Sequence, residues 1–145
     1  MTKDIAELIE YKIRELQKNL LLLKQVSFDI NKENLKRDML RYWGIERGLQ
    51  ISVECVIDIA NIIISTTELD KPDSYRETLL TLHKIGVIPE KFAKNIVGMA
   101  SFRNILVHDY LRVDEEIIID VLKNKLDDFA EYIKYVQTWL DKNYK

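Results

Sequence analysis

Apolar residues recur at intervals of three and four along nearly the whole chain, which is the period of one face of an α-helix. In residues 3–28 this stripe alternates with charged residues and comprises Ile5, Ile9, Ile13, Leu16, Leu20 and Leu23. In residues 114–143 the same spacing is typical of a helix-bundle seam and runs through Ile118, Leu122, Leu126, Phe129, Ile133, Val136 and Leu140. No segment shows the convincing two-residue alternation of a strand, so the pattern predicts an all-α protein.

Few helix-breaking residues interrupt the pattern, since the 145 residues include 4 glycines and 2 prolines. A polar turn is expected at 27–34 and a loop at 68–73. Further helices are expected over 35–66, 74–85 and 90–107. Gly86 suits a left-handed cap at the end of one of them, and Pro89 suits the first turn of the next. We expect a single domain, residues 1–145, folded as an up-and-down bundle of four to five helices.

The helix expected over 35–66 contains two glycines and two acidic residues in informative positions. Glycine costs about 1 kcal/mol relative to alanine inside a helix, so Gly44 and Gly48 indicate a close approach of a second helix. The second half of this helix, residues 51–64, is apolar enough to be central and buried. Glu54 and Asp58 lie one turn apart within it, and buried carboxylates require partners.

Composition narrows the class of protein. Cys55 is the only cysteine, so no internal disulfide can form, and a reducing, cytoplasmic location is favoured. The charged N-terminus does not resemble a signal peptide, and no apolar run reaches the ~18 residues of a membrane span, so we expect a soluble chain. The net charge of −2, from 22 basic and 24 acidic residues, gives no overall field that attracts nucleic acid. RNA binding would therefore need a local basic cleft.

The run from Arg103 to Tyr110, which reads Arg-Asn-Ile-Leu-Val-His-Asp-Tyr, places three polar side chains in apolar surroundings. Burying an unpaired charge is costly, so this arginine and histidine indicate a site. On a regular helix Arg103 lies in the middle of an apolar stripe, and Tyr110 lies nearly in line with it, close enough to pack on the guanidinium. The stripe consists of Phe92, Ile96, Met99, Leu106 and Tyr110.

His108 does not share that line, because five residues rotate it by about 140° from Arg103 on an ideal helix. The two side chains cannot converge on one ligand from one regular helix. Either the helix breaks near Val107, or a two-fold homodimer brings two copies of the motif together.

The chemistry that suits these residues is cleavage of RNA without a metal. A histidine, with a pKa of about 6.5 when unperturbed, can deprotonate the ribose 2′-OH or protonate the leaving 5′-oxygen. Arginine can stabilise the charge that develops on the phosphate. Metal catalysis is less favoured, since the only histidines are His83 and His108. The carboxylates of Glu54 and Asp58 alone offer too few ligands for a good Mg²⁺ site.

At these residues the sequence resembles the HEPN superfamily, through Arg-x4-His-x-Tyr near the end of an all-helical chain. The wider run of residues 99–110 resembles the HepT-type branch. Two further segments are similar to that branch: residues 46–60, with Glu46-Arg47-Gly48-Leu49-Gln50, Glu54 and Asp58-Ile59-Ala60, and residues 82–89, with Leu82 and Gly86-Val87-Ile88-Pro89. The resemblance covers essentially the whole chain.

The resemblance implies a metal-independent endoribonuclease toxin that works as a homodimer and needs no cofactor. It implies that Arg103 and His108 are catalytic, that Asn104 supports them, and that Tyr110 is the residue adenylylated by an MNT-type nucleotidyltransferase antitoxin. Asp109 occupies the variable position of the motif, so it belongs at most to the supporting residues. The implied substrate is RNA, with tRNA as one candidate.

Plainer interpretations remain open for the same residues. Arg103 could form a structural ion pair with Glu54 or Asp58, which is compatible with catalysis. His108 and His83 could each interact with a helix C-terminus. The tryptophans Trp43 and Trp139 are expected in the core or an interface, since no basic stripe accompanies them. A second class of function is a non-catalytic helical module that binds or regulates a small nucleotidyltransferase.

Overall fold

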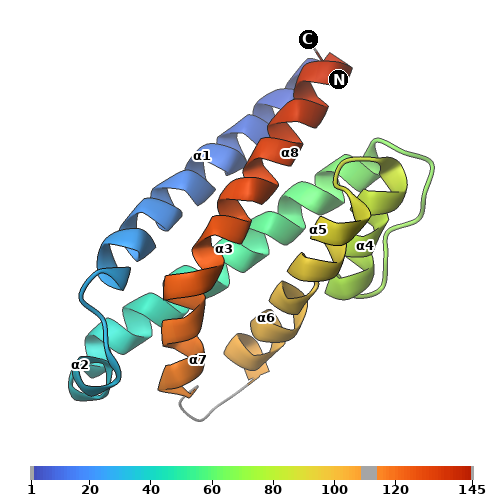
Figure 1. The fold of residues 1–145 in the computed structure, drawn as a ribbon. Helices are drawn as coiled ribbons and strands as arrows, with labels where there is room; N and C mark the ends of the chain where they lie inside the picture. The colour runs from blue at the N-terminus through green and yellow to red at the C-terminus, as the bar shows by residue number, and fades with distance from the viewer. Residues whose placement is uncertain (1, 109–113, 145) are drawn as a thin grey trace.

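The computed structural model describes residues 2–108 and 114–144, which form helices and no strand (Figure 1). The helices are α1 (Thr2–Ser27), α2 (Lys32–Arg37), α3 (Met39–Ser65), α4 (Tyr75–Ile85), α5 (Glu90–Ile96), α6 (Gly98–His108), α7 (Glu115–Asp120), the π-helix η1 (Val121–Lys125) and α8 (Leu126–Tyr144). Helix α1 packs against both α3 and α8, α4 and α6 pack against α3, and α5 lies against α4 and α6. The predicted all-α fold is confirmed.

Helix α3 is the centre of the bundle, as its apolar sequence predicts. Its buried residues contact α1, α4 and α6, and they include Leu49, Val53, Val56, Ile59, Ala60 and Ile63. By length and composition alone α3 could cross a membrane, but 56% of its most apolar window is buried against the rest of the molecule. The packing of the bundle accounts for its apolar character.

The expected polar turn at residues 27–34 is partly wrong, because a short helix, α2, begins there. Asn31 caps α2, and its side chain accepts a hydrogen bond from the Asn34 backbone at 2.9 Å. Asp38 then adopts an extended conformation and caps α3 by accepting from the Arg41 backbone at 3.0 Å. The long helix therefore begins at residue 39 rather than 35, since Asp38 satisfies backbone donors at its start.

The helix expected over residues 90–107 is two helices, α5 and α6, separated at Val97. The Ala100 amide bonds to the Val97 carbonyl, which is the tighter pattern of a turn. Pro89 precedes α5 as its N-cap residue rather than lying inside the first turn. Helix α6 is then continuous from Gly98 through His108, so the helix is not broken before His108.

The C-terminal helix follows the predicted path but contains a π-helical turn. Asp114 caps its start by accepting a hydrogen bond from the Glu116 backbone at 2.8 Å. Residues Val121–Lys125 then form η1 between α7 and α8. The apolar stripe is nevertheless buried, at Ile118, Leu122, Leu126, Phe129, Ile133, Val136 and Leu140.

The glycine predictions have different outcomes. Gly86 ends α4 with φ 94°, in the left-handed conformation expected of it. A Cβ at Gly48 would lie 3.3 Å from Leu23 Cδ2, so α1 does approach α3 closely there. A Cβ at Gly44 would meet nothing within 4 Å, so the expected close approach is wrong at that position.

Candidate functional site

Arg103 projects from α6 into a partly enclosed space between α3 and α4. Its side chain is 18% exposed, and one guanidinium nitrogen, Nη2, lies 3.3 Å from Glu54 Oε1. The Nε atom is buried and has no hydrogen-bond partner in the described part of the chain. The charge is thus taken out of water with one carboxylate to balance it, and one donor is left unused.

Glu54 and Asp58 have separate partners, although they lie one turn apart on α3. The Glu54 carboxylate, 35% exposed, faces Arg103. The Asp58 carboxylate is 57% exposed and pairs with Lys12 of α1 at 3.6 Å. The predicted ion pair of Arg103 is therefore confirmed with Glu54, and the expectation that Asp58 is buried is wrong.

The aromatic ring over Arg103 is Tyr75, which sequence reasoning missed. The guanidinium carbon lies 4.6 Å from the centroid of the Tyr75 ring, within the range of a cation–π contact. Tyr75 is the first residue of α4, immediately after the N-cap Ser74. Its position depends on how α4 packs against α6, and nothing in the sequence pattern signals that contact.

The rest of the motif is placed only in part. Asn104 is exposed on α6, next to Arg103. His108 is the last residue of α6, and its side chain lies outside the described residues. Asp109 and Tyr110 also lie outside them, so the expected stacking of Tyr110 on Arg103 stays a prediction.

The remaining polar and aromatic candidates are structural or exposed. His83 Nδ1 lies 3.1 Å from the Ile88 carbonyl oxygen, so His83 ties the end of α4 to the following turn. Trp139 packs edge-on against Tyr144 with ring centroids 5.5 Å apart. Trp43 is 57% exposed on α3, so it is not part of the core.

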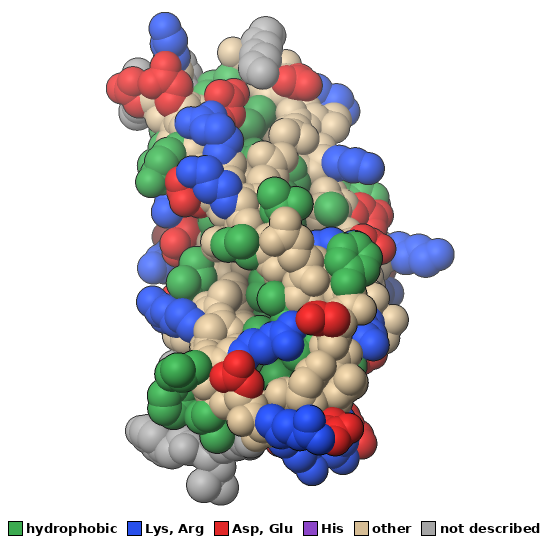
Figure 2. Space-filling view, turned by 90° about the vertical axis from the view of Figure 1, so that its left-hand side faces the viewer, with side chains coloured by type: hydrophobic (Ala, Val, Ile, Leu, Met, Phe, Trp, Pro, Cys, Tyr) green, Lys and Arg blue, Asp and Glu red, His purple; other side chains and the backbone are tan. Residues whose placement is uncertain are grey.

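The surface charges are mixed in sign. On the face that Figure 2 shows, lysine and arginine side chains alternate with aspartate and glutamate, and apolar side chains lie among them. Within residues 2–108 and 114–144, no group of three histidine, cysteine, aspartate or glutamate side chains could hold a metal ion. Among the described residues, the cluster of Tyr75, Arg103 and Glu54 is therefore the candidate site.

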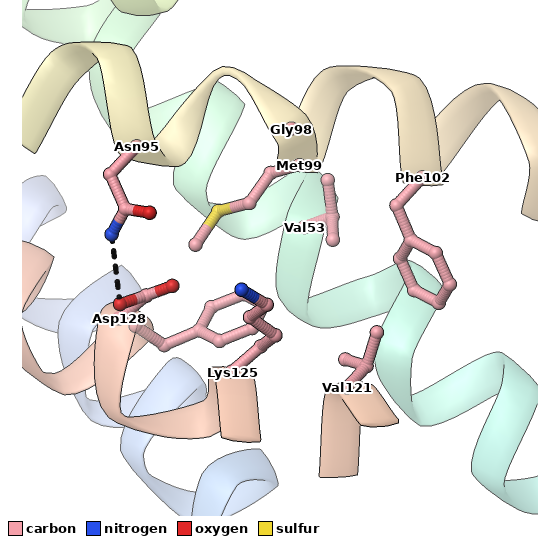
Figure 3. A pocket seen from close by; sticks show the side chains of 9 residues that line it. Val53, Asn95, Gly98, Met99, Phe102, Val121, Lys125 and Asp128 are labelled. Atoms are coloured by element: carbon pink, nitrogen blue, oxygen red, sulfur yellow. Dashed lines mark hydrogen bonds between the residues drawn. The ribbon is translucent and has the colours of Figure 1, made fainter. Parts of the chain in front are cut away.

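A cavity of about 160 Å³ opens beside this cluster, between α3, the α5–α6 pair and the η1–α8 segment (Figure 3). Phe102 lies at one end of it, directly before Arg103 in the sequence. Asn95 and Asp128 lie at the other end, where the amide donates a hydrogen bond to the carboxylate at 3.2 Å. The full lining is Val53, Asn95, Gly98, Met99, Phe102, Val121, Lys125, Asp128 and Phe129.

Comparison with known proteins identifies relatives that match most of this chain. Residues 16–136 match the family described as Ribonuclease HepT-like. The mRNA nuclease HepT of Shewanella oneidensis is 29% identical over 131 residues, which are 90% of this chain and 97% of that protein. The tRNA nuclease HepT of Aphanizomenon flos-aquae is 27% identical over 95 residues, 66% of this chain and 65% of that protein.

A solved structure shows the same fold. It is a tri-AMPylated Shewanella oneidensis HEPN toxin in complex with an MNT antitoxin, and it is 29% identical to this chain. The superposition has a TM-score of 0.79 and covers 90% of this chain and 96% of the other.

Proposed function

Because the chain belongs to the HepT-like ribonuclease family, we propose that it is a metal-independent endoribonuclease toxin whose active site is shared across a homodimer. The observation that carries the proposal is the family match over residues 16–136, and the presence of Arg103, His108 and Tyr110 within that range and the enclosed position of Arg103 support it. The whole chain, residues 1–145, acts as one domain in this proposal.

In the proposed reaction, His108 and Arg103 divide the work. One histidine removes the proton from a ribose 2′-OH, and that oxygen attacks the adjacent phosphorus. The 5′-oxygen leaves and takes a proton from a second histidine, so the products are a 2′,3′-cyclic phosphate and a 5′-OH. Arg103 stabilises the extra negative charge on the phosphate, which a guanidinium does with two hydrogen bonds.

The course of α6 supports the homodimer. The helix continues through His108, so a break before His108 does not bring the two motif residues together, and a second chain is the remaining way to do so. Trp43, Arg47 and Glu54 share one line along α3, and Trp43 is 57% exposed. A two-fold contact along this line would cover Trp43 and bring two Arg103 side chains near each other.

The antitoxin in this proposal is an MNT-type nucleotidyltransferase. The similar Shewanella oneidensis toxin is AMPylated and bound to an MNT antitoxin, which supports the same pairing here. Tyr110 would be the modified residue, with Asn104 and Asp109 supporting the motif. Toxin and antitoxin would meet in the cytoplasm, where the unpaired thiol of Cys55 stays reduced.

The test is cleavage of purified tRNA and mRNA by the purified protein in EDTA, with Arg103→Ala and His108→Ala beside it. Both RNA classes are included because the relatives are named as nucleases of one or the other. We expect cleavage by the unsubstituted protein alone, and an unchanged thermal transition for both variants. A mass spectrum establishes that Tyr110 is unmodified in the protein used.

Four outcomes would contradict the proposal or a part of it. Cleavage that survives both substitutions would place the site elsewhere, and cleavage only after metal addition would overturn the mechanism. If unmodified protein fails to cut any RNA, the chain is the non-catalytic partner of a nucleotidyltransferase. Cleavage at dilutions where only monomer remains would contradict the shared site.

A further inference from the structure

The cavity behind Phe102 has a mostly apolar lining, which suits a flat ring. Val53, Met99, Phe102, Val121 and Phe129 supply most of its lining. Its volume of about 160 Å³ is below the roughly 300 Å³ at which pockets for drug-sized ligands begin, so a single ring system is the fitting size. Aromatic side chains in such places stack on unpaired bases of RNA.

The far end of the cavity offers a specific set of hydrogen-bonding groups. The contact between Asn95 and Asp128 uses one amide hydrogen and one carboxylate oxygen. Among the described residues, the Asn95 amide oxygen and the second Asp128 oxygen make no further hydrogen bond, so both remain acceptors. Lys125 lines the same cavity and adds a donor.

The π-helix η1 contributes to the lining of the same cavity. Val121 and Lys125 are the first and last residues of η1, and both line the cavity. A π-turn inserts one residue relative to an α-helix, and such turns occur frequently at functional sites. Because the turn changes the register between α7 and α8, it sets which side chains of this segment face α6.

Two residues that line the cavity are sequence neighbours of the Arg103–Glu54 pair. Phe102 precedes Arg103 on α6, and Val53 precedes Glu54 on α3. Asn95 lies near the end of α5, seven residues before Phe102, and the junction at Val97 separates the two. A nucleotide with its phosphate at Arg103 could thus extend its base past Phe102 toward Asn95 and Asp128.

We infer that this cavity is a base-binding subsite that selects the nucleotide next to the cut, an inference that rests on the proposed ribonuclease function. The two acceptors require amine or N–H hydrogens on the base edge, and Lys125 requires a carbonyl oxygen. Guanine and cytosine carry both groups together. Adenine has no carbonyl oxygen, and uracil has a single N–H hydrogen for the two acceptors, so both fit less well.

The experiment is cleavage of an RNA pool randomised around one position, with sequencing of the cut ends. We expect the unsubstituted protein to prefer guanine or cytosine over uracil and adenine at one fixed position relative to the cut, by about fivefold or more. Asp128→Asn and Lys125→Met each reduce that preference while cleavage continues. The matched controls are Asp127→Asn and Lys123→Met, exposed neighbours on the same segment that do not line the cavity.

Two results would overturn the subsite. One is cleavage with no base preference at any position, and the other is a preference that Asp128→Asn and Lys125→Met leave unchanged. A purely structural link between α5 and α8 at Asn95 and Asp128 would lower the melting temperature of Asp128→Asn without altering the choice of base.

A binding measurement separates this inference from the proposed function. The methionine methyl groups of Met99, in the cavity, and Met39, at the start of α3, can be observed by NMR in protein labelled at methionine. We expect GMP and CMP to shift the Met99 signal more than AMP and UMP do, and to leave Met39 in place. Such shifts in a protein that cuts no RNA would refute the nuclease and retain the subsite. No shift of Met99 with any nucleotide, together with no base preference, would refute the subsite.

Discussion

Two regions of the molecule differ in how their buried polar groups are paired. One is the interior between α1, α3 and α8, and the other is the end where α3, α4 and α6 meet. In the interior, the Tyr132 hydroxyl donates to the Val56 carbonyl at 2.9 Å, and the Cys55 thiol donates to the Lys12 carbonyl at 3.2 Å. At the other end, Arg103 carries a full charge opposite one carboxylate, and its Nε has no partner among the described residues.

The difference separates stabilising packing from a site. A buried donor without a partner costs about 1–3 kcal/mol, and a packed apolar residue at position 103 would avoid that cost. In the interior, the Tyr132 hydroxyl and the Cys55 thiol both have partners, although Asn61 Oδ1 of α3 is also buried without one among the described residues. What distinguishes Arg103 is that it brings a full charge into a mostly buried position opposite one carboxylate, a cost that packing alone does not require.

The largest effect is expected in the interior, at Tyr132. Tyr132→Ala removes a fully buried ring and should lower the free energy of unfolding by about 3–5 kcal/mol, whereas Tyr132→Phe removes only one hydrogen bond and should cost about 1 kcal/mol. Urea unfolding followed by circular dichroism measures both. Equal losses for the two variants would mean that the ring contributes little packing.

Arg103→Met should show the opposite behaviour. We expect cleavage of RNA to fall about 10²–10³-fold, because a donor to the developing charge is lost, while the free energy of unfolding changes by less than about 1 kcal/mol. Glu54 is 35% exposed, so its carboxylate regains water when Arg103 is removed. A loss of stability like that of Tyr132→Ala would show that Arg103 is a structural residue, and the two regions would then not differ in this respect.

A pH titration sharpens the account of the interior. Burial raises the pKa of the Cys55 thiol from 9.0 to about 11, and burial also raises the pKa of the Tyr132 phenol. Both groups lose their protons first in the unfolded chain, so the stability that they contribute is complete below pH 9 and falls as the pH rises through 11. Unfolding measured between pH 8 and 11 should show this decline. Cys55→Ser should make it shallower, and an unchanged slope would contradict the assignment to the thiol.

The smallest expected effect concerns the ring over Arg103. A cation–π contact of this kind contributes about 0.5–1 kcal/mol, so Tyr75→Leu should lower kcat/KM by roughly twofold to fivefold, and Tyr75→Phe should retain it. Steady-state cleavage of one defined RNA measures both variants. Tyr11→Leu, on the exposed side of α1, is the matched control. If Tyr75→Phe loses as much as Tyr75→Leu, the hydroxyl rather than the ring is the contributing group.

Much of the fold could be predicted because burial follows helical periodicity. The stripe of α1 is buried at Ile9, Ile13, Leu16 and Leu23, the stripe from α7 through α8 is buried throughout, and Gly86 caps α4. The short helix α2, the separation of α5 from α6 and the π-turn η1 could not be predicted, since each shifts the register locally without interrupting the apolar pattern.

The candidate site was predicted unevenly. The cost of a buried charge left an ion pair of Arg103 with Glu54 or Asp58 open, the structure shows it with Glu54, and the family match confirms the HEPN resemblance. Tyr75 was missed, because 28 positions of sequence separate it from Arg103 and no periodicity links them. The roles of Asn104, His108, Asp109 and Tyr110 and the homodimer stay predictions for the experiments described above.

The sequence by itself determined an all-helical chain, its central helix and the motif that contains Arg103, because helix period and the cost of buried charge act on neighbouring residues. The tertiary structure decided which groups surround that charge. In the folded chain Arg103 pairs with Glu54 and not with Asp58, Tyr75 packs on the guanidinium, and a cavity is lined by Phe102. These contacts depend on how helices that are distant in sequence pack together.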